Sequence, residues 1–119
     1  MDYELQVDVE QLDKTTAVIN LVGDLTIFAD KPLHEAYKAV SNDGIRNVIF
    51  NFDERDLICT PGIAVLIDVI IEAYKKNQRL LMALPNAHFQ KIFYLMGITQ
   101  YARLFNSLEE AKQHALYSS

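Results

Sequence analysis

Residues 47–67 read NVIFNFDERDLICTPGIAVLI, and this stretch decides the fold. Its first six residues form a short apolar run rich in β-formers, which predicts a buried strand. The charged residues 53–56 predict a loop, and a helix of about residues 61–77 follows. A buried strand joined by a short loop to an apolar helix is typical of α/β proteins with a parallel sheet.

The segment before this stretch predicts two strands and one helix. Residues 3–9 alternate between apolar and polar side chains, which indicates a half-buried strand with one wet face. Residues 17–23 are mostly apolar and predict a second strand, paired with the first as an antiparallel hairpin. Residues 24–30 are expected to form a loop, and Asp30 then caps a helix with Pro32 just inside its start.

The segment after this stretch predicts two more strands and two more helices. Residues 79–84 are an apolar run that predicts a buried strand, after which Asn86 caps a helix. Residues 102–106 predict a short last strand. Ser107, followed three residues later by Glu110, is a capping box for a final helix.

The order of these elements predicts an α/β fold. After the initial hairpin, strands and helices alternate. We therefore expect a mostly parallel sheet of four to five strands, with an antiparallel edge strand and about four helices. The 119 residues suit a single domain over 1–119, with its core at about 3–116.

Composition disfavours several classes of function. The net charge is −5 and no block of Lys or Arg occurs, which argues against nucleic-acid binding. No apolar segment reaches ~18 residues, so no membrane span is predicted. The acidic N-terminus is not typical of a signal or transit peptide, and one cysteine cannot form an internal disulfide. We therefore expect a cytoplasmic protein.

The start of the helix at 61–77 is the candidate functional site. Thr60 is a favourable N-cap, Pro61 suits the first helical position, and Gly62 allows either a close backbone approach or a tight turn. Free N–H groups and a positive helix end favour an anion such as a phosphate there. Three hypotheses remain open: Thr60 is only a cap, Thr60 accepts a phosphoryl group, or Cys59 is a reactive thiol.

The same helix is apolar around more of its surface than one core-facing stripe requires. Either two layers cover it, or its first turn, with Ile63 and Val65, is exposed for a partner. Burial is expected for most of its apolar residues.

Other polar clusters carry weaker signals. The histidines His34, His88 and His114 lie on different predicted helices, without the paired spacing of metal ligands. The acidic loop at 53–56 leaves a cation site open as an alternative, although no P-loop accompanies it. No nucleophile–base–acid set occurs, so neither an enzyme nor a cofactor or metal site is predicted.

Several segments together resemble STAS domains. The resemblance spans about residues 3–116 and is greatest for the bacterial anti-sigma factor antagonists, which implies the STAS fold. It rests on four matches in the expected order, namely INLVGDL at 19–25, NVIFNF at 47–52, LICTPGIAVLI at 57–67 and MGITQYARLFNSLEEAKQHA at 96–115.

The resemblance implies a partner-switching function. In this family the helix start commonly reads Asp-Ser-Ser-Gly, and the anti-sigma factor, itself a serine kinase, phosphorylates the first Ser. The unphosphorylated protein binds the anti-sigma factor and frees the sigma factor; phosphorylation breaks the complex and a phosphatase restores it. Aligned on Gly62, this chain has Cys59 at the Asp, Thr60 at the acceptor Ser and Pro61 at the second Ser.

The resemblance also implies which residues meet the partner. The turn Gly23-Asp24-Leu25 resembles one that lies beside the phosphorylation site in family members, with Thr26 in place of a frequent acidic residue. The implied partner is an anti-sigma factor or a related histidine-kinase-like serine/threonine kinase. A PP2C-type phosphatase and a homodimer stay open. The expected contacts, besides the phosphoacceptor Thr60, are Asp24, Thr26, Cys59, Pro61, Gly62 and Ile63.

Two other functions compete with this one. The first is a constitutive interaction module without phosphorylation, such as a scaffold or a subunit of a signalling or lipid-transport assembly. The second is a small-molecule or nucleotide-binding domain, or an enzyme. The absence of a phosphate-cradling Gly loop disfavours this second alternative.

Overall fold

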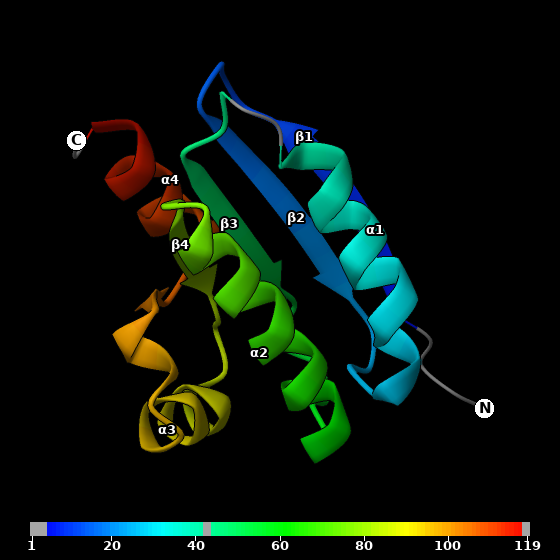
Figure 1. The fold of residues 1–119 in the computed structure, drawn as a ribbon. Coiled ribbons are helices and arrows are strands. Elements are labelled where there is room, and N and C mark those ends of the chain that lie inside the picture. Colours follow the sequence, from blue (N-terminus) through cyan, green and yellow to red (C-terminus); the bar gives the residue numbers. More distant parts are fainter. Residues whose placement is uncertain (1–4, 42–43, 118–119) are drawn as a thin grey trace.

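A five-stranded mixed sheet forms the centre of the molecule (Figure 1). The computed structural model describes residues 5–41 and 44–117. In these residues the elements are, in chain order, β1 (Gln6–Gln11), β2 (Thr16–Val22), the short 3-10 helix η1 (Ile27–Ala29), α1 (Asp30–Val40), β3 (Asn47–Phe52), α2 (Thr60–Lys75), β4 (Arg79–Ala83), α3 (Ala87–Leu95), the 3-10 helix η2 (Ile98–Gln100), β5 (Ala102–Phe105) and α4 (Leu108–Tyr117).

The sheet has the strand order β1-β2-β3-β4-β5 and one antiparallel edge. β1 runs antiparallel to β2, with Val7 opposite Leu21. The other neighbouring strands are parallel, with Ile19 beside Phe50 across β2 and β3. The predicted hairpin and mostly parallel sheet are therefore confirmed. Tyr3, which the sequence places in the first strand, lies outside the described residues.

Helices cover both faces of the sheet. Ile19 of β2 belongs to the large core beneath α1 and α2, whereas its neighbour Val18 belongs to a smaller core that includes Ala111 and Ala115 of α4. Figure 1 shows α1 and α2 side by side on one face of the sheet. Burial on both faces explains why the central strands read as continuous apolar runs rather than alternating ones.

The start of α1 differs from the prediction by one residue. The helix begins at Asp30, and Ala29 holds the N-cap position without a side-chain hydrogen bond. The reason is η1, which lies in the predicted loop and leads directly into α1. Thr26 Oγ1 caps η1 instead, by accepting the N–H of Phe28 at 3.2 Å. The predicted cap at Asp30 is therefore wrong, and the capping residue lies four positions earlier.

The two later caps fit the prediction more closely. Asn86 Oδ1 accepts the N–H of Phe89 at 3.2 Å, which confirms the cap of α3. Ser107 Oγ accepts the N–H of Glu110 at 3.2 Å, as a capping box requires. The return bond is displaced by one residue, because the Glu110 carboxylate accepts the N–H of Asn106 at 3.4 Å.

The helix α2 is buried on more than one side. Its first turn lies against η1, and the rest contacts α1 and β4. Ile63 is only 5% exposed and Val65 only 7%, so the alternative of an exposed first turn is wrong for these side chains. No helix within residues 5–41 and 44–117 combines the length and the apolar character needed to cross a membrane.

Candidate functional site

Main-chain hydrogen bonds fix the start of α2 to the turn after β2. The N–H of Leu25 donates to the Leu57 carbonyl at 2.7 Å, and the N–H of Cys59 donates to the Leu25 carbonyl at 3.0 Å. Leu25 and Ile58 thereby form a short parallel bridge beyond the end of the sheet. Because Cys59 is held extended in this bridge, it occupies the N-cap position and Thr60 is the first helical residue. The predicted N-cap role of Thr60 is therefore wrong.

Gly62 allows the first turn of α2 to lie directly against this turn. A Cβ atom at Gly62 would overlap the carbonyl oxygen of Leu25 and stand 2.5 Å from its carbonyl carbon. These are backbone atoms that cannot rotate away as a flexible side chain would. Of the two roles considered for Gly62, the structure therefore supports the close backbone approach.

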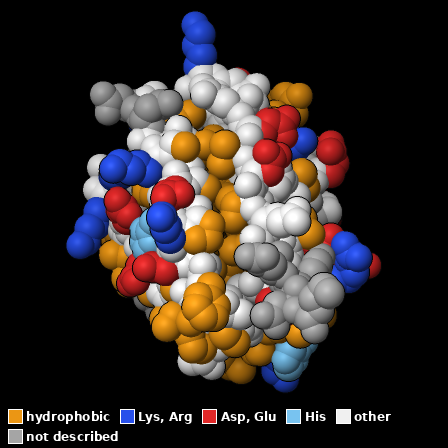
Figure 2. Space-filling model, turned by 90° about the vertical axis from the view of Figure 1, so that its right-hand side faces the viewer, with side chains coloured by type: hydrophobic (Ala, Val, Ile, Leu, Met, Phe, Trp, Pro, Cys, Tyr) orange, Lys and Arg blue, Asp and Glu red, His pale blue; other side chains and the backbone are white. Residues whose placement is uncertain are grey.

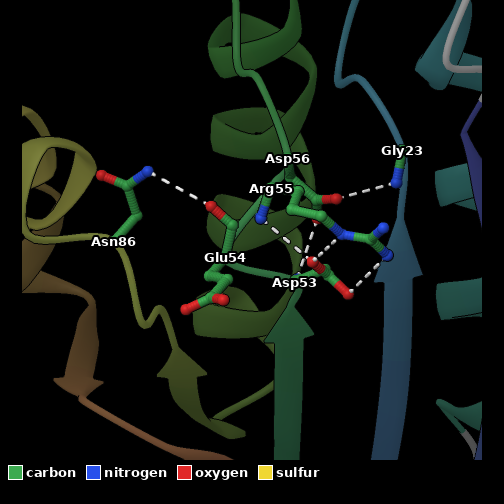
Figure 3. A network of polar contacts seen from close by, with 6 residues as sticks. All are labelled: Gly23, Asp53, Glu54, Arg55, Asp56 and Asn86. Atoms are coloured by element: carbon green, nitrogen blue, oxygen red, sulfur yellow. Dashed lines mark hydrogen bonds and ion pairs between the residues drawn. The ribbon is translucent and has the colours of Figure 1, made fainter.

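Asp56 braces the loop between β3 and α2 from inside. Its side chain is 3% exposed, and its two carboxylate oxygens accept the N–H groups of Gly23 at 2.8 Å and Asp53 at 3.0 Å (Figure 3). Gly23 has φ 122°, a conformation that favours glycine. Burial raises the pKa of the Asp56 carboxyl above its ordinary value, and the nearby charges of Asp53 and Asp24 act in the same direction.

The remaining polar groups of this loop bond to one another or to Asn86. The Arg55 guanidinium donates to Asp53 at 3.1 Å and lowers the pKa of that carboxyl. The carbonyl of Glu54 faces the amide of Asn86, which donates to it at 3.5 Å (Figure 3). No group of three or more His, Cys, Asp or Glu residues in the described part of the chain could hold a metal ion. The hydrogen bonds of Asp53 and Asp56 brace this loop.

Asp24 is the second carboxylate of this region. Its Oδ1 is buried without a hydrogen-bond partner among the described residues. A buried polar oxygen without a partner costs free energy, and such atoms in native proteins call for a functional or structural reason. Asp24 adjoins Leu25, and Thr60 adjoins Cys59, so the Leu25–Cys59 bond brings these two predicted site residues into one region.

Exposed apolar side chains surround the start of α2. Phe28 is 86% exposed, and Ile27 and Leu57 are each 62% exposed. Figure 2 shows hydrophobic side chains gathered at the lower end of the face that it draws, at the level where Figure 1 places η1 and the beginning of α2. We call Ile27, Phe28, Leu57, Cys59 and Thr60, all exposed, the α2-start surface.

The predicted site residues differ in exposure, and Asp24 and Thr26 are half-buried. Cys59, Thr60 and Pro61 are exposed, whereas Gly62 and Ile63 are buried and support the site from below. Ile27, Phe28 and Leu57 were not predicted as site residues from the sequence. The available signal was three large apolar residues within segments predicted to be loops, where such residues are either buried or left for a partner.

The family assignment follows from the match of the whole arrangement. The family model described as STAS domain matches residues 6–111 of the chain, which include all five strands and the first turn of α4. The chain belongs to the STAS domain family. The resemblance predicted from the sequence is thereby confirmed for the family.

Solved structures support the same fold. The STAS domain described here is similar to the anti-sigma factor antagonist SpoIIAA in its unphosphorylated form, with 21% identity, 92% of this chain and 96% of that chain covered, and a TM-score of 0.71. The phosphorylated form of SpoIIAA from Bacillus is 19% identical, with 92% of this chain and 99% of that chain covered and a TM-score of 0.68. An anti-sigma factor antagonist from Mycobacterium paratuberculosis is 17% identical, with 92% of each chain covered and a TM-score of 0.71.

Proposed function

We propose that this STAS domain is an anti-sigma factor antagonist in a partner-switching pathway. It binds an anti-sigma factor that is also a serine/threonine kinase, and phosphorylation of Thr60 weakens that binding. The chain acts as a binding module and catalyses no reaction of its own. The observation that carries the proposal is an exposed threonine at the first residue of α2, within a cluster of exposed apolar side chains.

The apolar part of the α2-start surface supplies the docking energy in this proposal. Phe28 is the anchor, because an aromatic side chain that is 86% exposed gains most from burial against a partner. Ile27 and Leu57 add apolar area on either side of it. Asp24 offers a carboxylate oxygen that lacks a donor within the described chain, and a donor from the partner would satisfy it.

The switch acts through charge. A phosphate on Thr60 adds nearly two negative charges, and the free N–H groups in the first turn of α2 tolerate an anion without loss of the fold. In the complex the same phosphate would lie against apolar partner surface and close to the carboxylate of Asp24. Desolvation and repulsion therefore weaken docking. The similarity to SpoIIAA, which has been solved in unphosphorylated and phosphorylated forms, favours this mechanism.

Phosphorylation is tested by intact-mass analysis after incubation with the cognate kinase and ATP. We expect one added phosphate on the wild type and on Thr99→Ala, a matched exposed threonine in η2. We expect none on Thr60→Ala. A phosphate gained equally by Thr60→Ala, or by none of the three proteins, would contradict the switch.

Docking is tested by measuring the affinity of variants for the same kinase. Phe28→Ala should bind at least tenfold more weakly, whereas Tyr117→Ala, a matched aromatic that is 83% exposed on α4, should bind like the wild type. Thr60→Asp should bind at least tenfold more weakly than Thr60→Ala. Equal binding by the two Thr60 variants, with loss only in Phe28→Ala, would instead support a constitutive interaction module.

A further inference from the structure

A second exposed apolar region lies far from the α2-start surface. A groove of about 940 Å³ runs over the β5 edge of the sheet, between the last turn of α2, α3 and α4. Its walls include the exposed rings of Tyr74, Tyr94 and Tyr101, and the first and last of these stack edge to face with centroids 5.1 Å apart. We call this region the β5 groove.

The β5 groove is independent of the proposed phosphorylation site. Tyr74 lies 14 residues after Thr60 on α2, which places it about 21 Å further along the helix axis at ~1.5 Å per residue. In Figure 1 the orange segment that contains β5 lies at the left-hand edge of the molecule, whereas α2 begins at the bottom. A ligand in the groove would therefore leave Thr60 uncovered.

The charge of the groove is opposite to that of the chain. Arg79, Lys91 and Arg103 line it, and none of the described residues that line it is Asp or Glu. The chain as a whole has a net charge of −5, so this local excess of cations is not a property of the general surface. Cations gathered beside apolar rings favour an anionic partner through electrostatic complementarity.

Arg79 and Arg103 both lie close enough to His114 for their charges to affect its pKa. Burial lowers the pKa of His114, which also lines the groove, and the positive charges of Arg103 and Arg79 lower it further. Arg79 Nε donates to Asn47 Oδ1 at 2.8 Å, and the Arg103 guanidinium lies 5.7 Å from the centroid of the Phe105 ring. Both guanidiniums are thus positioned by neighbouring side chains, as binding groups require.

The strand at the base of the groove ends the sheet. Within the described residues β5 has β4 as its only neighbouring strand, with Leu81 beside Arg103. An edge strand presents N–H and C=O groups on its outer side, and an extended peptide can pair with them. A peptide bound in this way alternates its side chains, so one set would face the tyrosines and the cations.

We propose that the β5 groove binds an extended, acidic peptide segment of a partner protein, which pairs with the outer edge of β5. Its Asp or Glu residues meet Lys91, Arg79 and Arg103, and an apolar or aromatic residue rests on Tyr94 and Tyr101. This surface is additional to the proposed docking at the α2-start surface and does not depend on it. Phosphorylation of Thr60 therefore leaves binding in the groove unchanged.

The test begins with a random 12-residue peptide library displayed on phage and selected on the whole chain. We expect enrichment of peptides in which Asp or Glu alternates with apolar residues. The tightest peptide, labelled with a fluorophore, should bind at least tenfold more weakly to the double variant Lys91→Glu/Arg103→Glu, measured by fluorescence anisotropy. Lys38→Glu, an exposed lysine on α1 outside the groove, is the matched control and should change the affinity less than twofold.

Two further measurements locate the peptide. Tyr94→Ala should weaken binding about fivefold and Tyr117→Ala, whose ring lies outside the groove, should not. Amide NMR signals of residues 101–105 should shift on titration with the peptide, while those of residues 57–63 stay in place. The side chains of Tyr94 and Tyr117 are both exposed, so neither substitution removes core packing and both variants should fold like the wild type.

Several outcomes would overturn the proposal. Selected peptides without acidic enrichment, equal binding by Lys91→Glu/Arg103→Glu and the wild type, or NMR shifts confined to the α2-start surface each contradict it. Self-association in sedimentation experiments that is abolished by the same double variant would assign the groove to a second copy of this chain.

Discussion

The two exposed apolar regions, at opposite ends of α2, are built in different ways. The α2-start surface rests on main-chain contacts, because Leu25 bonds to Leu57 and Cys59 and lies against Gly62. The β5 groove consists of residues from six separate elements, namely α2, β4, α3, η2, β5 and α4. Rigid backbone suits a site that must present one hydroxyl in one place. Side chains from several elements suit a site that accepts related peptides of different sequence, because each peptide can contact a different subset of them.

Gly62→Ala should break the α2-start surface and have the largest effect on stability. The added methyl group overlaps the Leu25 carbonyl, so α2 and the turn after β2 must separate. We expect a loss of about 3 kcal/mol in the free energy of unfolding, measured by urea denaturation. The matched control is Ala64→Ser, an exposed position in the same turn, which should cost less than about 1 kcal/mol. A Gly62→Ala protein as stable as this control would show that the close approach is not required.

Asp56→Asn should weaken the same region from inside. The variant's amide can accept one of the two N–H groups from Gly23 and Asp53 but meets the other with its own donor. We expect a loss of about 2 kcal/mol at pH 7 in urea denaturation. The peptide affinity of the β5 groove should not change, because Asp56 does not line it.

The stability difference between the wild type and Asp56→Asn should depend on pH in one direction. The folded-state pKa of Asp56 is raised above 3.8, mainly by burial, so the folded protein binds more protons than the unfolded chain above pH 3.8. The contribution of Asp56 to stability is therefore complete below pH 3.8 and declines as the pH rises through the raised pKa. The stability difference between wild type and Asp56→Asn should shrink from pH 3.5 to pH 7. The lowered pKa of Asp53 affects both proteins and largely cancels. A difference that grows with pH would contradict the assigned direction.

Asn86→Ala tests the connection between the two regions. Asn86 caps α3, which forms one wall of the β5 groove, and its amide also donates to the Glu54 carbonyl in the acidic loop. Loss of an N-cap costs about 1 kcal/mol. Hydrogen exchange should quicken in the first turn of α3 more than in α2. Gln113→Ala, an exposed amide on α4, is the control and should leave both helices unchanged.

The sequence predicted the sheet well because its signals were local and strong. The apolar runs at 47–52 and 79–84 predicted buried strands, and the structure has β3 and β4 there. The mostly parallel pairing of the strands followed from the alternation of strands and helices after the hairpin. Asn86 caps α3 as predicted. The element before α3 is the strand β4, whereas α1 follows directly on the 3-10 helix η1 and has no such cap.

The details of the site were less predictable because they depend on contacts between distant residues. Threonine is a preferred N-cap residue, but the hydrogen bond between Cys59 and Leu25 places the helix start one residue earlier, so that Cys59 is the N-cap. Ile63 looked available for a partner, yet the glycine beside it draws the first turn against the backbone of Leu25 and buries Ile63. The β5 groove was not foreseen, since its cations come from β4, α3 and β5 and meet only in the folded chain.

Thr60→Asp should produce the smallest change in stability, and its direction separates the two ends of α2. A negative charge at the first helical residue interacts favourably with the helix dipole, so the free protein should become more stable by about 0.5 kcal/mol even though docking weakens. Asn77→Asp places the same charge just beyond the C-terminal end, where Asn77 has φ 61°, and should destabilise the protein by a similar amount. Asp tolerates that conformation about as well as Asn, so the comparison isolates the charge. Thermal unfolding in 50 mM and 1 M NaCl measures both variants, and high salt should bring their melting temperatures together. If Thr60→Asp lowers stability at low salt, a phosphate at this position would disturb the fold as well as the docking, and the proposed switch would lose its physical basis.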